Sequence, residues 1–212
     1  MEVEELLKPF PHLIDAVEFD RCYKDIIVET TDSSVIVIPS RNLKIKVSLY
    51  GSSLVRSFIF YCENEEKSIL SLKSTASNLK CSCLLIELPH RCFQTLYVST
   101  QEHNIYIFPS VCVKDLSLHT SSGYVETDCS FKSVTINTLS GTIDLRTIGR
   151  ANISLKISSL SGLILADFSG IGFWDANVKS KEGEVRLRPL RKLGHRAIGS
   201  VKTRTGNIRI IY

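Results

Sequence analysis

The sequence predicts a single-domain, all-β solenoid (a β-helix) of about seven or more coils. Three observations predict this fold. A twelve-residue pattern recurs at least five times along the chain. Apolar and polar residues alternate with a period of two from about residue 26 onward, as they do in half-buried strands. No segment carries apolar residues at the 3.6-residue spacing of a helix over twelve positions, so strands rather than helices build the domain.

The repeated pattern reads Φ-x-Φ-x-S/T-x-x-G-x-Φ-x-Φ, where Φ is an apolar residue. Clear copies begin at Leu116, Val134, Leu155, Ala176 and Gly199. Each places a glycine at the corner between two short strands, and these structural corner positions are Gly123, Gly141, Gly162, Gly183 and Gly206. Weaker copies begin at Leu70 and Leu96, where the glycine position holds Ser77 and His103.

Each corner glycine supplies either a positive φ or a close backbone approach. The hydroxyl of the Ser or Thr three residues earlier can hydrogen-bond the backbone of the corner. One unit of about twenty residues cannot fold alone, because its few buried apolar side chains do not offset the entropy of ordering its backbone. We therefore expect the units to stack on one another, as solenoid repeats do.

Two kinds of stacking satisfy the inward periodicity. In a β-helix each copy forms one coil, and equivalent residues of neighbouring coils lie about 4.8 Å apart. In stacked β-hairpins, the strands on either side of Gly141 would pair, so that Thr138 faces Ile143. In four successive copies, the residue after the second strand alternates in charge: Asp128, Arg146, Asp167 and Arg188. Stacked coils would turn these residues into a charge ladder, which favours the β-helix.

The domain spans residues 1–212 in this prediction, with an N-terminal cap at 1–30, divergent strands at 31–69 and repeats at 70–212. The cap holds a short helical turn near residues 4–8 that ends before Pro9 and Pro11, or else a capping strand.

Three corner segments carry a resemblance to a known family. They are Thr-Ser-Ser-Gly-Tyr-Val-Glu-Thr (120–127), Thr-Leu-Ser-Gly-Thr-Ile-Asp-Leu (138–145) and Ser-Leu-Ser-Gly-Leu-Ile-Leu-Ala (159–166). With them the chain resembles the putative-adhesin β-strand-repeat family, a bacterial and eukaryotic domain of unknown function. The resemblance covers about residues 68–210 well and 26–67 loosely. It implies a β-solenoid fold and brings no catalytic residues.

Opposite charges gather at the two ends of the chain. Residues 1–32 carry nine acidic and three basic residues, whereas residues 179–212 carry ten basic and two acidic ones. Stacked coils would align the cations in outward columns: Lys179 with Lys202, Lys181 with Arg204, and Arg186 with Arg209. The predicted interaction surface comprises Lys179, Lys181, Arg186, Arg191, Lys192, Arg196, Lys202, Arg204 and Arg209.

This surface predicts an acidic protein or an anionic membrane surface as partner. Nucleic acid is disfavoured, because the aromatic residues that stack on bases are not interleaved with these cations. The opposite charges of the two ends also predict head-to-tail self-association between molecules, or contact of the acidic N-terminal segment with the basic end within one molecule.

The acids and histidines form no recognisable catalytic set. A polysaccharide-cleaving pair needs two carboxyls within roughly 5–10 Å of each other. Asp128 and Asp167 share a column of the β-helix, but Arg146 between them would hold both acids ionised. The Gly170–Gly172 segment lacks the third glycine of a nucleotide-binding loop. We therefore predict no catalytic, cofactor-binding or metal-ligating residues.

The cysteines and the first twenty residues indicate in which cellular compartment the protein resides. The seven cysteines are odd in number and lack zinc-finger spacing, which predicts reduced thiols. The acidic first twenty residues match neither a secretory signal nor a mitochondrial presequence. No apolar run reaches the length of a transmembrane segment. These features predict an intracellular, cytoplasmic protein, or a mitochondrial one if a leader precedes this sequence.

Together these observations predict a non-enzymatic scaffold or protein-interaction module with a basic C-terminal contact surface. The alternative is a polysaccharide-active or nucleic-acid-binding β-helix protein.

Overall fold

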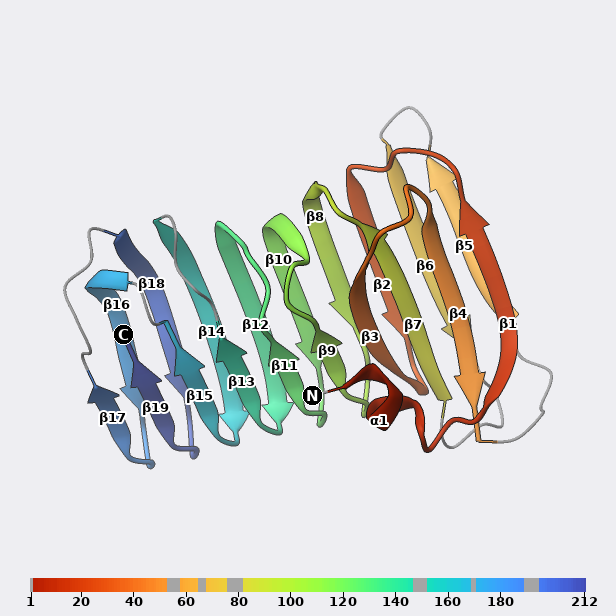
Figure 1. The fold of residues 1–212 in the computed structure, drawn as a ribbon. Coiled ribbons are helices and arrows are strands. Elements are labelled where there is room, and N and C mark those ends of the chain that lie inside the picture. Colours follow the sequence, from red (N-terminus) through yellow and green to blue (C-terminus); the bar gives the residue numbers. More distant parts are fainter. Residues whose placement is uncertain are drawn as a thin grey trace.

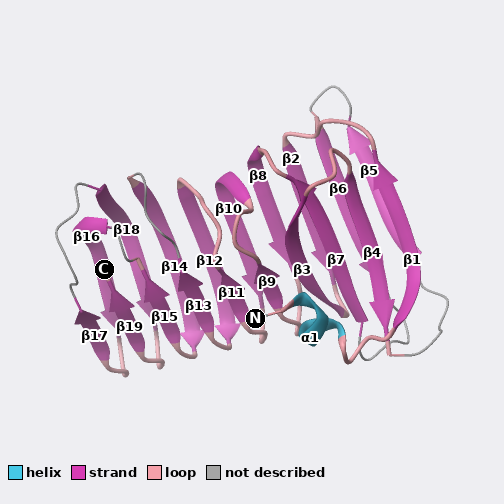
Figure 2. Cartoon of the chain, in the orientation of Figure 1, coloured by secondary structure: helices cyan, strands magenta, loops and turns pink. Residues whose placement is uncertain are grey.

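Two long β-sheets face each other along the length of the molecule (Figure 1). The computed structural model describes residues 2–52, 58–64, 68–75, 82–146, 152–168, 171–188 and 195–212. Over these residues most of the chain is strand, and a short helix lies on the outside of one sheet (Figure 2).

Within the described ranges, sheet A has ten strands and sheet B has nine. In spatial order, sheet A contains β1 (His12–Phe19), β4 (Ile45–Gly51), β7 (Ser82–Pro89), β3 (Ser33–Ser40), β9 (Ile105–Ile107), β11 (Val125–Thr127), β13 (Ile143–Arg146), β15 (Ile164–Asp167), β19 (Ile208–Ile211) and β17 (Val185–Arg188). Sheet B contains β5 (Phe58–Asn64), β6 (Ile69–Thr75), β2 (Asp25–Thr30), β8 (Cys92–Ser99), β10 (Cys112–Thr120), β12 (Ser133–Ser140), β14 (Ile153–Ser161), β18 (His195–Thr203) and β16 (Ile171–Ser180).

Each coil gives one strand to each sheet, and neighbouring coils pair in parallel. Leu118 lies opposite Ile136, and Ile136 lies opposite Ile157. The strands β12 and β13, which the hairpin alternative would pair, lie in different sheets. The predicted β-solenoid is therefore confirmed, and the hairpin alternative is wrong.

The core fills the space between the two sheets. Alternate side chains of each coil point inward, so that Leu118, Ile136 and Ile157 are almost fully buried. Equivalent inward positions are stacked at the strand spacing of about 4.8 Å, and each coil thereby covers the apolar side chains of the next.

The corner glycines are stacked so closely that a side chain has no room. A Cβ on Gly141 would lie 2.2 Å from the carbonyl oxygen of Gly123, and one on Gly162 would lie 2.0 Å from that of Gly141. Gly141 also has a φ of +133°, which L side chains rarely adopt. Of the two predicted roles for this glycine, the structure shows both.

The Ser and Thr hydroxyls of the corners bond the backbone as the sequence predicts. The N–H of Gly123 donates to Thr120 Oγ1 at 3.1 Å, and the N–H of Gly206 donates to Thr203 Oγ1 at 3.1 Å. At the Thr-Leu-Ser-Gly corner the hydroxyl of Thr138 donates instead to the carbonyl oxygen of Ser140 at 2.9 Å. These hydroxyls satisfy backbone groups at the turns, which leave the regular strand pairing.

The coils do not stack in the order of the sequence at either end. The last coil, β18/β19, lies between β14/β15 and β16/β17. Near the N-terminus, β2/β3 lies between β6/β7 and β8/β9. The edge of the solenoid at the C-terminal end is therefore β16/β17, and not the coil that ends the chain (Figure 1).

This order corrects the predicted charge ladder. Arg146 lies opposite Asp167, but Ile211 separates Asp167 from Arg188. The side chain of Arg146 pairs with Asp144 on its own strand at 2.8 Å. The β-helix interpretation was right, but the alternating ladder that favoured it does not extend to the fourth residue.

The coil β2/β3 fits the repeat pattern although it was assigned to the cap and the divergent strands. Ile26, Val28, Val35 and Val37 occupy its inward positions, and Ser33 occupies the glycine position. The outer strands β1, β4 and β5 pair antiparallel with their neighbours and close this end.

Helix α1 (Val3–Leu7) covers part of the outer face of sheet A. Its Leu6 packs in a second apolar cluster around Ile36 and Leu85, which lie opposite each other on β3 and β7. These strands are apolar on both faces because the helix covers the outer one. In the described part of the chain, no helix is long and apolar enough to cross a bilayer.

Candidate interaction surface

Four cations of the last two coils gather on one side of the molecule. Lys179 on β16 lies directly opposite Lys202 on β18, and both are exposed because the neighbouring Val178 and Val201 point inward. At the next corner, the N–H of Glu182 donates to the carbonyl oxygen of Arg204 at 3.0 Å, which brings the corners of Lys181 and Arg204 side by side. We call Lys179, Lys181, Lys202 and Arg204 the basic face.

Two further predicted cations lie on the other sheet. Arg186 and Arg209 are opposite each other on β17 and β19, on the outer side of sheet A. The Nε of Arg186 donates to Glu184 Oε1 at 2.6 Å, and this hydrogen bond lowers the pKa of the Glu184 carboxyl. The Arg186 charge therefore has a partner within its own coil.

The remaining predicted cations lie apart from the basic face and from the pair of Arg186 and Arg209. Arg196 pairs with Asp175 on the neighbouring strand, near the start of β18. Arg191 and Lys192 lie outside the described residues. The nine predicted residues thus form several clusters, of which the basic face is the largest among the described residues.

The basic face is electrostatically uncompensated. Among the residues that the structure describes, its four cations make no ion pair, whereas Arg186 and Arg196 each have an acidic partner. Like charges directly opposite on neighbouring strands destabilise a sheet. Unfavourable local arrangements of this kind are found in proteins mainly at functional sites.

A shallow groove of about 580 Å³ runs beside the same corners on the outer side of sheet B. Its floor is one outward column, in which Ser99, His119, Asn137 and Ser158 lie opposite one another on successive strands. Leu139 and Leu160 stand on its corner side and are 58% and 48% exposed. We call this feature the corner groove. The corner groove is not predicted from the sequence, although Leu139 and Leu160 occupy the same position in their corners.

The floor of the corner groove is a connected polar network. The Ser158 hydroxyl donates to Asn137 Oδ1, and the Asn137 amide lies 3.3 Å from His119 Nδ1. The other ring nitrogen of His119 lies 2.9 Å from the Ser117 hydroxyl. Burial lowers the pKa of His119, so its imidazole is uncharged at neutral pH.

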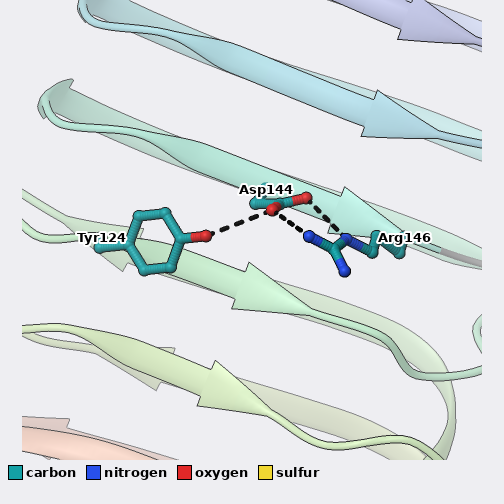
Figure 3. A network of polar contacts seen from close by, with 3 residues as sticks. All are labelled: Tyr124, Asp144 and Arg146. Carbon is teal, nitrogen blue, oxygen red and sulfur yellow. Dashed lines mark hydrogen bonds and ion pairs between the residues drawn. The ribbon is translucent and has the colours of Figure 1, made fainter. Parts of the chain in front are cut away.

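A second polar cluster lies on the outer side of sheet A (Figure 3). Arg146 donates two hydrogen bonds to Asp144, from Nε at 3.2 Å and from Nη2 at 2.8 Å. Tyr124 Oη donates to the same carboxylate at 3.2 Å. Burial and the Asp144 charge both raise the pKa of Tyr124. Asp144 is 7% exposed, and a bidentate arginine is the partner that such a buried carboxylate requires.

A small cavity of about 110 Å³ lies beside this cluster, and Asp128 lines it together with Tyr106 and Phe108. Burial raises the pKa of Asp128, and the nearby Arg146 opposes this shift without cancelling it. Arg146 thus favours the ionised form of Asp128, as the sequence analysis expects, but burial outweighs it in the direction of the pKa shift.

Three of the described cysteines have thiols that resist ionisation. Burial raises the pKa of Cys83 and of Cys129 to about 12, and that of Cys112 to about 11, so these thiols stay protonated at neutral pH. Across the described ranges, no group of three or more His, Cys, Asp or Glu side chains could hold a metal ion.

Comparisons with known proteins agree with this architecture. Two solved structures have the same fold. One is a putative cell adhesion protein from Clostridium sporogenes, with a TM-score of 0.54 and 13% identity, covering 93% of this chain and 98% of that one. The other is a putative adhesin from Bacteroides fragilis, with a TM-score of 0.52 and 14% identity, covering 95% and 98%. No curated protein matches the sequence. The model of the Toastrack DUF4097 family matches residues 23–212. This chain, a β-solenoid with stacked glycine corners, belongs to the Toastrack DUF4097 family.

Proposed function

We propose that this chain is a non-enzymatic interaction module whose basic face binds an acidic protein partner. The observation that carries the proposal is the direct opposition of Lys179 and Lys202, two exposed like charges without an acidic partner among the described residues. An acidic ligand would turn this repulsion into attraction. The likeness of the fold to two proteins named as adhesion proteins supports an interaction role.

The chemistry of the surface favours a protein over the other anionic partners. Aromatic side chains that could stack on bases are not interleaved with the four cations. Membrane binding by a flat basic patch is strengthened by apolar side chains that insert between lipids. Among the cations themselves, the outward strand positions beside Lys179 and Lys202 hold Asn177 and Ser200, and the exposed Leu139 and Leu160 lie on the adjoining coils.

The first experiment measures binding of fluorescent poly-L-glutamate by anisotropy. We expect the unmodified protein to bind, and the affinity to fall between 50 and 150 mM salt as screening increases. Reversing all four charges (Lys179→Glu, Lys181→Glu, Lys202→Glu and Arg204→Glu) should weaken binding by about tenfold or more. A matched control reverses four other exposed lysines and changes the net charge equally: Lys8→Glu, Lys24→Glu, Lys114→Glu and Lys132→Glu.

Equal loss of binding in both quadruple variants would show that only the net charge matters and would overturn the proposal. So would tighter binding of phosphatidylserine vesicles, which would indicate a membrane surface, or of single-stranded DNA. A variant with glutamine at the four positions guards against misfolding. It should bind weakly while its melting temperature stays the same or rises, because it removes the repulsion between opposed cations.

A further inference from the structure

The corner groove and the basic face are parts of one continuous surface. The floor column of Ser99, His119, Asn137 and Ser158 continues in register to Lys202 on β18 and then to Lys179 on β16. The residues two positions before the corner glycines form a second column beside it, which we call the corner column. Leu160 follows Leu139 there, and the backbone N–H of Arg204 donates to the carbonyl oxygen of Leu160 at 3.2 Å.

The two halves of this surface differ in chemistry. In the groove half, the floor is uncharged and hydrogen-bonded within itself, and the corner presents two exposed leucines. In the adjoining half, the same two columns present only cations, namely Lys202 and Lys179 on the floor and Arg204 and Lys181 at the corner. A ligand that covers both halves needs an apolar part and an anionic part in line.

The dimensions of the surface suit a short extended chain. Neighbouring strands are about 4.8 Å apart, so the five steps from Ser99 to Lys179 span about 24 Å. An extended polypeptide rises about 3.4 Å per residue, and about seven residues cover this length. Its side chains on one face recur about every 6.8 Å, which lets successive ones reach the leucines and then the cations.

We propose that the corner groove and the basic face together bind an extended acidic peptide segment that carries aliphatic side chains beside its acidic ones. This inference rests on the proposed function and adds the form of the ligand. The aliphatic side chains pack against Leu139 and Leu160, and the carboxylates lie over Lys179, Lys181, Lys202 and Arg204. Burying exposed leucine surface is favourable in proportion to the apolar area removed from water, and the cations fix which end of the groove receives the acids.

Two synthetic peptides test this inference. Both carry four glutamates, and one adds two leucines at alternate positions where the other has alanines. We expect the unmodified protein to bind the leucine peptide about tenfold more tightly than the alanine peptide. Replacing both groove leucines (Leu139→Ser and Leu160→Ser) should abolish this preference and leave the affinity for the alanine peptide unchanged. A matched control replaces two other exposed leucines, Leu13→Ser and Leu43→Ser, and should keep the preference.

The outcomes separate this inference from the proposed function. Equal affinity of the unmodified protein for both peptides would overturn the groove as an apolar subsite, while binding that still depends on the four cations would leave the proposed function intact. Loss of the preference in the control variant as well would also overturn the inference. If neither peptide nor poly-L-glutamate binds, both proposals fail. Circular dichroism and thermal melting of each variant confirm that the solenoid is folded.

Discussion

At the scale of single residues, the corner glycines decide how closely successive coils approach. The Cα of Gly141 faces the carbonyl oxygen of Gly123 at a distance that leaves no space for a methyl group, and its φ is positive. Side chains at such backbone conformations cost about 1–3 kcal/mol each, and here the coil below must also move.

Gly141→Ala should therefore lower the free energy of unfolding by about 2 kcal/mol or more. For a chain of this size, that change lowers the melting temperature by roughly 4–8 °C. Ser122→Ala, at an exposed position of the adjacent corner, serves as the control and should change stability by less than about 0.5 kcal/mol. A melting temperature equal to that of the unmodified protein would contradict the close stacking of the corners.

Asp128 makes stability depend on pH in a direction opposite to that of a salt-bridged acid. Its pKa is raised by burial, so the folded protein holds this proton more tightly than the unfolded chain does. The ionised carboxylate therefore opposes folding at neutral pH, and this cost disappears as the pH falls through the raised pKa toward about 3.9, the value in the unfolded chain.

Asp128→Asn should stabilise the protein slightly at pH 7, by less than about 0.5 kcal/mol after solvent screening. The gain should shrink toward zero as the pH is lowered, and urea unfolding at several pH values measures it. Glu102→Gln, an exposed carboxylate change of the same kind, gives the baseline. Destabilisation by Asp128→Asn at pH 7 would mean that attraction to Arg146 outweighs the desolvation of the carboxylate.

At the scale of elements, the sequence predicted the strands and corners, because these depend on the local spacing of apolar residues. The strands on either side of each glycine corner follow from alternating inward residues, and the hydroxyl of Thr120 indicated the hydrogen bond that closes its corner. The coil β2/β3 carries the same spacing, but Ser33 in place of glycine concealed it. The sequence predicted helix α1 only as a short turn. The helix is stabilised by covering Ile36 and Leu85, which are distant in the sequence, so local spacing does not reveal it.

The order of the coils could not be predicted, because the inward residues of different coils are chemically interchangeable. Ile157, Val201 and Val178 stack in that order, yet exchanging the two valines would bury the same side chains. Hydrophobic burial therefore favours stacking without specifying which coil is the neighbour. The basic face was predictable, since either order brings Lys179 and Lys202 together. The corner groove was not, because it depends on outward residues of four different coils.

At the scale of the whole molecule, the stability of the edge coil β16/β17 depends on the coil β18/β19, which lies between it and β14/β15. Over the described residues, β16 pairs with β18 and β17 pairs with β19, and neither has a second sheet partner. The edge coil β16/β17 is therefore held in place by the final residues of the chain.

A protein that ends at residue 194 should lose the structure of residues 171–188 as well as the deleted coil. Hydrogen exchange should show unprotected amides at 171–188 and protected ones at 112–146. The matched control excises residues 171–194 and joins 170 to 195. It should keep β18 and β19 protected, because they pair directly with β14 and β15. Protected amides at 171–188 in the truncated protein would contradict the inserted order.

Charge also differs between the two ends of the solenoid. Asp15 and Glu18 lie on the edge strand β1, and Arg186 and Arg188 lie on the edge strand β17 at the opposite end. The head-to-tail self-association expected from the sequence stays a prediction, and analytical ultracentrifugation at low and high salt measures it.

The inserted coil also affects the order in which the coils can fold while the chain is being translated. A ribosome releases the N-terminal coils first, and most of them can dock as soon as they emerge. Residues 171–188 emerge before the strands on which they dock, so they wait unpaired while residues 189–212 are translated. At about 5–20 residues per second, this wait lasts about 1–5 s. During that interval the growing edge is β14/β15, and a newborn chain is then most exposed to pairing with the wrong strand.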